Sequence, residues 1–277
     1  MPEGPEIRRA ADRIGKVLVG ERLEEVFFAF DALRDRGAEL AGTSVASVDT
    51  RGKAMLIRFA NGLTLYSHNQ LYGRWYTRRR GQWPDTRRSL RVALHTARHS
   101  ALLYSASDVS LLDEEELSRH PFLSRLGPDI LDRSLTEEAI EERLRSDRFR
   151  RRSLAALYLD QAFLAGLGNY LRSEILNRAG LHPRRRPQDL TPEAVSALAA
   201  ETLAVARRSY RTGGVTLTDS RVRQARRRAD GRRRRFYVFS RASRPCLDCG
   251  AAIVRENFGS RRLYFCPRCQ AEENGGG

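Results

Sequence analysis

Four cysteines near the end of the chain constrain its folding more than any other feature. Cys246, Cys249, Cys266 and Cys269 form two C-x2-C pairs, and the 277 residues contain no other cysteine. Each pair makes a tight turn that directs two thiolates to one ion, and two such turns complete the tetrahedral site of a structural zinc. Disulfides or a redox pair are the alternatives, and a cytoplasmic chain disfavours both. We therefore expect one structural Zn2+ bound by these four residues.

The residues between the two cysteine pairs predict a β-hairpin. Ala252–Val254 and Leu263–Phe265 have the pattern of two short strands, with Asn257–Gly259 near the turn. Arg261 and Arg262 follow the turn, and a hairpin clamped by zinc would present them rigidly. The alternative is that both are ordinary exposed charges.

The charge balance indicates a polyanionic partner. Lys and Arg number 50 against 34 Asp and Glu, which gives a formal charge of +16 and a pI near 10.7. Nucleic acid is the first candidate and an anionic membrane the second, although genomic base composition also accounts for an arginine bias. Only Lys16 and Lys53 are lysines, and Arg221–Arg235 is rich enough in arginine to predict a solvated or mobile linker. We expect no membrane span and, without a signal peptide, a cytoplasmic location.

The first half of the chain predicts one helix followed by strands. Apolar residues recur at helical spacing over Pro5–Val19. An Asn-Gly pair between two β-rich segments is typical of a hairpin. This pattern favours a β-sandwich or a barrel. The expected strands are Glu25–Phe30, Ser44–Val48, Ala54–Phe59, Leu63–Ser67, Leu90–His95 and Ala101–Ser105.

The second half is predicted to be helical. The pattern loosens over His120–Leu131, which we interpret as the domain boundary. Ser134–Glu137 reads as a capping box that opens a helix to about Arg145. Further helices are expected over Arg151–Leu164, over Tyr170–Ala179 and from Thr191 to about Arg207.

The N-terminus carries a candidate nucleophile. Removal of Met1 would leave Pro2 as a secondary amine, and a free α-amino group has a pKa of about 8. The helix that starts near Pro5 places its positive end beside this amine and favours the neutral form. Glu3 and Glu6 are candidate acids or bases. The alternative is that both glutamates merely complement the helix dipole and that the leading proline is frayed.

Two further segments carry candidate binding residues. In the first, Gly166 and Gly168 expose backbone N–H groups before Asn169 opens a helix, a geometry that can hold a phosphate; a plain helical hairpin is the alternative. In the second, Ser67–Trp75 places polar, apolar and aromatic side chains in an expected loop that can wedge into a base stack. Here the alternative is that Leu71 and Tyr72 belong to the core and that Lys53 is a surface lysine.

These motifs together resemble the formamidopyrimidine-DNA glycosylase and endonuclease VIII family. The resemblance rests on Pro2–Glu6, Arg51–Lys53, the Gly166–Asn169 turn and the cysteine hairpin, in this order over nearly the whole chain. His68–Gly73 resembles the endonuclease VIII branch, which prefers oxidised pyrimidines. The Arg221–Arg235 stretch is more basic than the family leads us to expect.

The resemblance implies an α+β multidomain fold. It divides the chain into an N-terminal β-sandwich with a leading helix (1–124), a helix-two-turns-helix domain (134–236) and a C-terminal zinc-finger β-hairpin (237–277). The implied partner is damaged double-stranded DNA, bound by a monomer in the bacterial cytoplasm, with no membrane.

The resemblance also implies residue roles. Pro2 would attack C1′ of the damaged nucleotide and form an iminium, Glu3 would protonate the sugar ring oxygen, and Glu6 would support the site. Lys53, counted with the catalytic residues, would grip a phosphate beside the lesion together with Asn169 and Arg261. The void left by the flipped base would be filled by Gln70, Leu71 and Tyr72.

The expected function is that of a bifunctional glycosylase and abasic-site lyase of base excision repair. It would remove oxidised pyrimidines from DNA and then nick the strand by β,δ-elimination. An iminium is an electron sink that acidifies the C2′ proton, and only an amine nucleophile provides one. The alternatives are a glycosylase for oxidised purines (formamidopyrimidines) of the same family and a non-catalytic zinc-finger protein that binds DNA.

Overall fold

The protein consists of two compact units, residues 1–126 and 127–277, which we call the N-terminal and C-terminal units. A computed structural model describes residues 2–227 and 234–272. Within these ranges, no helix has the length and apolar character needed to cross a membrane.

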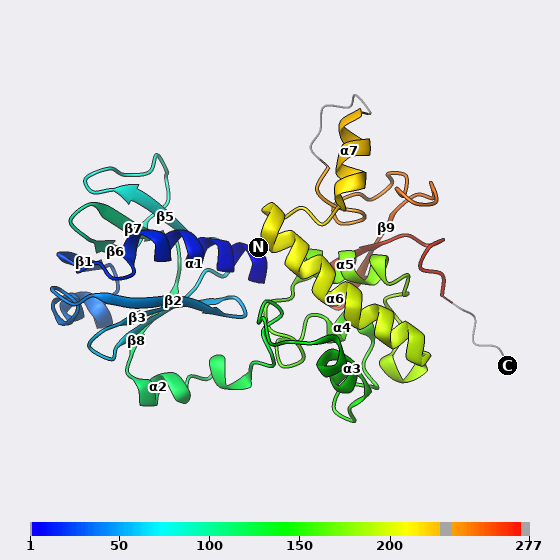
Figure 1. Ribbon diagram of the computed structural model, residues 1–277, viewed down its shortest axis with the longest axis horizontal. Helices are drawn as coiled ribbons and strands as arrows, with labels where there is room; N and C mark the ends of the chain where they lie inside the picture. Colours follow the sequence, from blue (N-terminus) through cyan, green and yellow to red (C-terminus); the bar gives the residue numbers. More distant parts are fainter. Residues whose placement is uncertain (1, 228–233, 273–277) are drawn as a thin grey trace. The chain divides into compact units, whose positions relative to one another are not determined.

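The N-terminal unit contains two four-stranded antiparallel sheets (Figure 1). Apolar residues of both sheets and of helix α1 (Gly4–Leu18) form one shared core, so the predicted β-sandwich with a leading helix is confirmed and the barrel is excluded. In spatial order, the first sheet is β1 (Glu25–Phe28), β6 (Leu90–His95), β7 (His99–Tyr104) and β5 (Arg74–Arg79), and the second is β2 (Val45–Arg51), β3 (Ala54–Phe59), β4 (Thr64–His68) and β8 (Asp108–Leu112).

Strand β3 shows how period-two patterning builds the sandwich. Met55 and Ile57 point into the shared core, whereas Ala54 and Leu56 point to the outer face. That outer face is covered by Leu117 and its neighbours from α2 (Glu114–Ser118) and the 3-10 turn η2 (Leu123–Arg125). Another 3-10 segment, η1 (Asp31–Glu39), follows β1. Because β3 is buried on both faces, its sequence is nearly all apolar.

Two strands of the sandwich were not predicted. β5 reads Arg-Trp-Tyr-Thr-Arg-Arg, and only Trp75 of this segment enters the shared core. The guanidinium groups of Arg74 and Arg78 lie over the Tyr76 ring, so the polar residues pack against an aromatic on the outer face. Charge thus masks the strand pattern. The second missed strand, β8, pairs with β4 and closes the other sheet.

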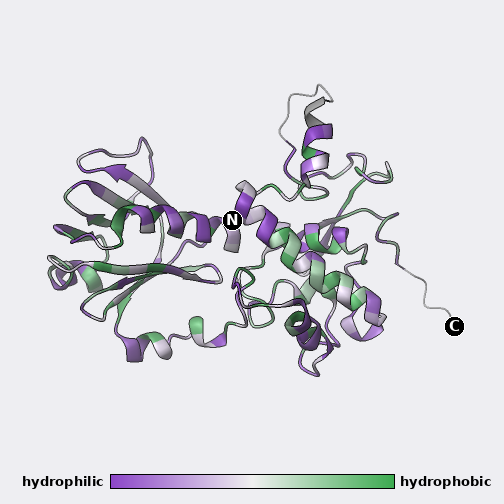
Figure 2. Cartoon of the chain, in the orientation of Figure 1, coloured by the Kyte–Doolittle hydropathy of each residue, from purple (hydrophilic) through white to green (hydrophobic). Residues whose placement is uncertain are grey.

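The C-terminal unit is built around helix α5 (Asn169–Arg178), which is buried on all sides. Helix α6 (Pro192–Thr212) carries polar and apolar residues along its length and packs its apolar face on the same core (Figure 2). Leu263 and Phe265 of the zinc hairpin also belong to this core. The elements are α3 (Glu137–Arg145), α4 (Leu154–Leu157), α5, η3 (Pro187–Asp189), α6 (Pro192–Thr212), α7 (Asp219–Arg227), β9 (Val254–Phe258) and β10 (Arg261–Phe265).

The long helix predicted over Arg151–Leu164 is wrong. Only Leu154–Leu157 is helical, and turns follow it. The Asp160 carboxylate accepts the N–H of Ala162 at 2.8 Å, and such local side-chain bonds compete with helix formation.

Other element ends also differ from the prediction. Thr136, not Ser134, caps α3, because its hydroxyl accepts the N–H of Ala139 while Ser134 bonds to Asp132. Helix α6 continues to Thr212 and ends where Gly213 adopts φ 75°.

The basic stretch and the hairpin also depart from expectation. The prediction of a linker over Arg221–Arg235 is wrong for residues 221–227, because they belong to helix α7. Residues 228–233 lie outside the described residues. The hairpin strands are longer than expected, so Asn257 and Phe258 belong to β9 and the turn is Gly259-Ser260. The division into domains at 1–124, 134–236 and 237–277 stays a prediction.

Candidate functional site

The N-terminus of α1 holds three of the candidate catalytic residues. Glu3 is 2% exposed and serves as the N-cap residue, and Pro2 before it is half-buried. The Glu6 carboxylate accepts the backbone N–H of Glu3 at 3.0 Å. Both glutamates therefore lie beside Pro2, at the positive end of the helix dipole. Met1, whose removal we expect, lies outside the described residues.

The packing of α1 on β2 shows which end of the unit this site occupies. Val19, just after the helix, bridges to Val45 at the start of β2, and Gly15 lies against Val48 further along the strand. The helix and β2 thus run in opposite directions, so the N-terminal end of α1 lies toward Arg51 at the C-terminal end of β2. Pro2 accordingly lies at the end of the unit where β2 turns into β3 (Figure 1).

Lys53 is fixed in that β2–β3 turn. Arg51 pairs with Ala54, which leaves a two-residue turn of Gly52 and Lys53. Gly52 adopts φ 60°, the left-handed conformation that tight hairpin turns require. Ala54 pairs with His68, so Lys53 lies next to the end of β4. Burial lowers the pKa of His68; the Asp108 charge opposes this lowering and the Lys53 charge adds to it.

The β4–β5 loop, residues 69–73, begins at this same end of the sheet. The N–H of Gly73 donates to the Asn69 carbonyl at 2.7 Å, and a Cβ on Gly73 would lie 2.6 Å from that oxygen. Only glycine fits there without a shift of the backbone. Leu71 and Tyr72 are 57% and 67% exposed, so neither belongs to the core.

Neighbouring side chains hold this loop. The Nδ1 atom of His68 accepts the N–H of Gln70 at 3.2 Å, where Gln70 has φ 47°. Ser107 donates its hydroxyl to the Gln70 amide oxygen at 2.9 Å, and Arg88 donates to the Tyr72 carbonyl. The loop is thus preorganised with two large side chains facing solvent. One end of the N-terminal unit therefore collects Pro2, Glu3, Glu6, Lys53, Gln70, Leu71 and Tyr72.

In the C-terminal unit, the Gly166–Asn169 turn is fixed by one glutamine. The Gln161 amide oxygen accepts the N–H of Gly166 at 3.1 Å, and its amide nitrogen donates to the carbonyls of Leu159 and Leu167 at 3.0 and 2.9 Å. Gly166 adopts φ 97°. The chain then enters α5 with Asn169 as its first residue, at the positive end of the helix.

Arg261 is presented by the zinc hairpin. It is exposed, begins β10, and pairs with Phe258 across the two-residue turn. Asn169 and Arg261 both belong to the C-terminal unit, and α5 contacts β10.

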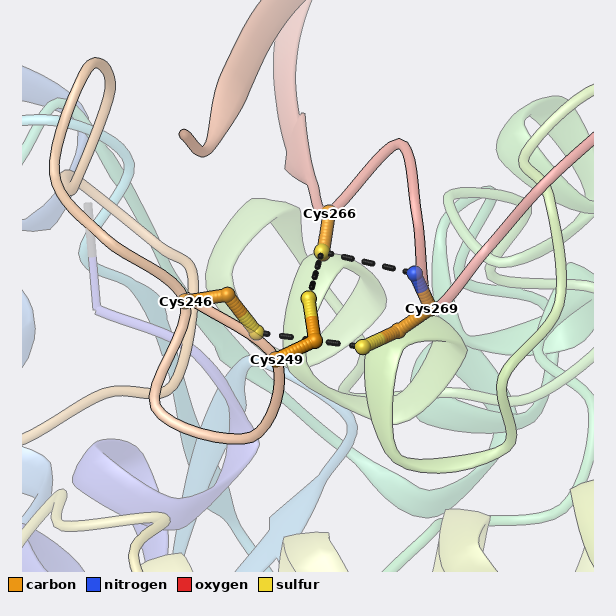
Figure 3. A group of neighbouring side chains, drawn as sticks. All are labelled: Cys246, Cys249, Cys266 and Cys269. Atoms are coloured by element: carbon orange, nitrogen blue, oxygen red, sulfur yellow. Dashed lines mark hydrogen bonds between the residues drawn. The ribbon is translucent and has the colours of Figure 1, made fainter. Parts of the chain in front are cut away.

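The four cysteines cluster as a metal site requires (Figure 3). Their Sγ atoms all lie within 4.8 Å of one another, with 3.9 Å between Cys246 and Cys269 and 3.4 Å between Cys249 and Cys266. All four are free thiols, which excludes the disulfide alternative. A backbone hydrogen bond involving Ala251 lowers the pKa of Cys249 to about 7, whereas burial raises the pKa of Cys266 and of Cys269. Four thiolates with this spacing fit one tetrahedral Zn2+.

Buried polar residues on α5 were missed by the sequence analysis. Glu174 has no exposed surface, and its carboxylate accepts the N–H groups of Tyr237, Val238 and Phe239 at 2.8, 2.8 and 2.9 Å and the hydroxyl of Thr216. Burial raises the pKa of Glu174, and these hydrogen bonds oppose that rise. Arg172, Ser173 and Asn177 are also buried. Nothing in the sequence around Glu174 distinguishes this buried glutamate from a glutamate on the exposed face of a helix.

The sandwich, the helical unit with its glycine turn and the four-thiolate hairpin define a zinc-finger protein with the helix-two-turns-helix fold. Residues 1–109 match the family described as formamidopyrimidine-DNA glycosylase N-terminal domain, and residues 126–221 match the H2TH domain of the same glycosylase. Residues 243–271 match the zinc finger found in FPG and IleRS, so the protein holds one structural zinc.

The chain belongs to the formamidopyrimidine-DNA glycosylase and endonuclease VIII family. It is 50% identical over 270 residues to Endonuclease 8 of Escherichia coli and to that of Shigella sonnei, covering 98% of this chain and 100% of each relative. Lactococcus lactis Fpg (MutM), solved with DNA containing N7-benzyl-Fapy-dG, superposes with a TM-score of 0.80 at 19% identity and covers 98% of this chain and 100% of that one. MutM solved with DNA containing carbocyclic 8-oxo-G gives 0.79 at 19% identity and the same coverage. The predicted family and fold class are confirmed.

Proposed function

We propose that this protein is a bifunctional DNA glycosylase and abasic-site lyase of base excision repair that acts on oxidised pyrimidines in duplex DNA. One observation carries the proposal. A single end of the N-terminal unit combines the Pro2–Glu6 segment, Lys53 and the exposed Leu71–Tyr72 pair. The 50% identity to Endonuclease 8 over the whole of that relative supports the same assignment.

In this proposal Pro2 supplies the nucleophile. Its neutral amine forms a bond to C1′ as the bond from C1′ to the damaged base breaks, and the base leaves with the proton that the amine nitrogen loses. Glu3, buried beside Pro2, protonates the sugar ring oxygen so that the ring opens to an iminium. Glu6 holds the backbone N–H of Glu3 and so keeps the segment in place.

The iminium then drives strand cleavage. Loss of the C2′ proton to a base sends its electron pair to the positive nitrogen and gives an enamine. The enamine returns the pair as the C3′–O bond breaks and the 3′-phosphate leaves, which restores a conjugated iminium, and loss of the C4′ proton then lets δ-elimination break the C5′–O bond. Hydrolysis returns the neutral amine. All of these steps use groups of the chain and water. The bound zinc supplies a structural cross-link between the two cysteine turns.

The remaining candidate residues bind the DNA. Lys53, Asn169 and Arg261 contact phosphates near the lesion and give an affinity that is independent of sequence and sensitive to salt. Gln70, Leu71 and Tyr72 fill the duplex void when the damaged nucleotide is flipped. A rigid loop with exposed apolar side chains suits this task, because it adds little ordering cost to the few kcal/mol of unstacking.

Trapping with borohydride tests the proposal. Borohydride reduces the iminium and leaves wild-type protein covalently bound to lesion-containing duplex, whereas Pro2→Ala gives no such product. Pro192→Ala is the matched control, since Pro192 is the first residue of α6 and belongs to the C-terminal unit. Failure of the wild type to trap, or trapping by Pro2→Ala, would contradict the mechanism. Absence of a covalent product with intact DNA binding would support a binding-only protein instead.

Substrate choice needs a separate comparison. We expect faster cleavage of duplex containing thymine glycol than of duplex containing 8-oxoguanine opposite cytosine. The opposite ranking would assign the protein to the purine-directed branch. We further propose that it acts as a monomer on DNA in the bacterial cytoplasm, which a sedimentation measurement with and without duplex checks.

A further inference from the structure

A buried arginine in α5 contacts both segments of the C-terminal unit that carry a proposed phosphate ligand. These segments are the start of α5, with Asn169, and β10, which begins with Arg261. Arg172 has no exposed surface. Its guanidinium donates to the Ala155 carbonyl at 2.8 Å, to the Asn169 side-chain oxygen at 2.6 Å and to the Arg262 carbonyl at 3.1 Å. These acceptors belong to α4, the first residue of α5, and β10. Burying a charge is costly unless hydrogen bonds satisfy it, and this one is bound by three elements.

The contact determines which way the Asn169 amide faces. A guanidinium has five N–H donors and no acceptor, so only the oxygen of the amide can face Arg172. The two N–H donors of Asn169 are therefore directed to the opposite side of the amide. An amide in this orientation offers donors, which a phosphate accepts, and withholds its acceptor.

The same guanidinium fixes the zinc hairpin against α5. It holds the carbonyl of Arg262, the residue after Arg261 on β10. Ser173, the next residue on α5, adds a second link, because its hydroxyl oxygen accepts the N–H of Tyr264 at 3.3 Å. The spacing between Asn169 and the strand that begins with Arg261 thus depends on Arg172.

We propose that Arg172 is a positioning residue for DNA binding, which orients the Asn169 amide and aligns β10 so that Asn169 and Arg261 engage phosphates together. This rests on the proposed function, which makes Asn169 and Arg261 phosphate ligands. Arg172 does not contact the DNA and leaves the chemistry at Pro2 unchanged.

Arg172→Lys keeps the charge but cannot bind all three acceptors. We expect the Kd for duplex with a stable abasic-site analogue to rise about tenfold, the size of one lost hydrogen bond to a charged group. The single-turnover trapping rate at saturating DNA should not change. Arg143→Lys is the matched control: Arg143 binds the carbonyls of Phe163 and Ala162 at 2.9 and 2.7 Å without touching Asn169 or β10.

A mutant cycle separates positioning from general loss of structure. The penalty of Arg172→Lys should shrink in an Asn169→Ala or Arg261→Ala background and vanish in the double background, while any penalty of Arg143→Lys should add independently. Wild-type affinity in Arg172→Lys, or fully additive losses, would overturn the inference. Wild-type trapping on DNA is measured in parallel, so failure of the proposed function is recognised separately.

A second variant tests the orientation without relying on a lysine that folds. Asn169→Asp keeps an oxygen for Arg172 but removes the donors, so we expect an equal or higher Tm together with lost DNA binding. An aspartate at a helix N-terminus also gains from the dipole, with or without Arg172. We therefore expect the Tm difference between Asp and Asn to be larger, in favour of Asp, with Arg172 present than in an Arg172→Gln background. A Tm lowered by Asn169→Asp, or a Tm difference that is unchanged without Arg172, would overturn the inference.

Discussion

The two units position their candidate residues by different means. In the N-terminal unit, an apolar core and short turns are sufficient: Gly52 and Gly73 set the backbone, and Lys53 and Leu71 follow from it. In the C-terminal unit, α5 buries charged and polar residues, and a metal clamps the hairpin beside it. Apolar packing is non-directional, whereas a buried hydrogen bond is lost when its partner moves. We therefore expect the C-terminal surface to be the more sensitive to single substitutions.

The two tryptophans allow this comparison to be tested, since Trp75 and Trp83 both belong to the N-terminal unit. Fluorescence thus reports on the sandwich, while far-ultraviolet circular dichroism is dominated by the helices of the C-terminal unit.

Removal of zinc should have the largest effect. Structural zinc contributes on the order of 10 kcal/mol of binding free energy in small metal domains. Chelation, or Cys266→Ser, should release one zinc per chain, expose the β9–β10 hairpin to proteolysis and abolish trapping, with tryptophan fluorescence unchanged. Metal content, limited proteolysis and fluorescence on one sample check this. A metal-free protein that traps DNA normally would show that the hairpin does not need its clamp.

Glu174→Gln should have the next largest effect. The new amide nitrogen would face backbone N–H donors that now bind a carboxylate, so we expect a loss of about 3 kcal/mol in the free energy of unfolding. Urea unfolding followed by circular dichroism measures it. Glu137→Gln, exposed in the first turn of α3, is the control and should stay within about 0.5 kcal/mol of wild type. Equal effects for the two variants would contradict the role of Glu174.

Gly73→Ala tests the N-terminal loop. The added Cβ would meet the Asn69 carbonyl at 2.6 Å, so the backbone must shift, at a cost of about 1–3 kcal/mol. We expect weaker binding to lesion duplex and a change in tryptophan fluorescence, without loss of zinc. Gly62→Ala is the control, because its φ of 87° strains the new residue but nothing lies within 4 Å of the Cβ. If Gly62→Ala weakens DNA binding as much, strain elsewhere explains the loss.

Acidification should have the smallest effect. Burial lowers the pKa of His68 and His95 below 6.5, so the folded N-terminal unit binds fewer protons than the unfolded chain near that pH. The stability is therefore present above pH 6.5 and decreases as pH falls below it. His68→Asn keeps an acceptor for the Gln70 N–H and should flatten part of this dependence. A pH profile of unfolding that is unchanged by His68→Asn would exclude His68 as its source.

The sequence predicted much of the fold because the signals were local. Spacing of the four cysteines gave the metal cluster, and runs of β-rich residues gave β3 and β6 with their observed ends. It failed where side chains override local preference. Beyond α4, the Asp160 carboxylate binds the backbone where apolar spacing favours a helix, and arginines obscure β5.

What the sequence determined by itself are the features carried by neighbouring residues: the candidate nucleophile at Pro2, the turn at Gly52 and the thiolate pairs. The tertiary structure alone decided which residues meet across the chain. Register places Lys53 beside His68, and burial makes Arg172 and Glu174 the internal partners of Asn169, Thr216 and the segment Tyr237–Phe239. The physical reason is that hydropathy records the average cost of burying a side chain, whereas the actual cost depends on partners that only the folded chain supplies.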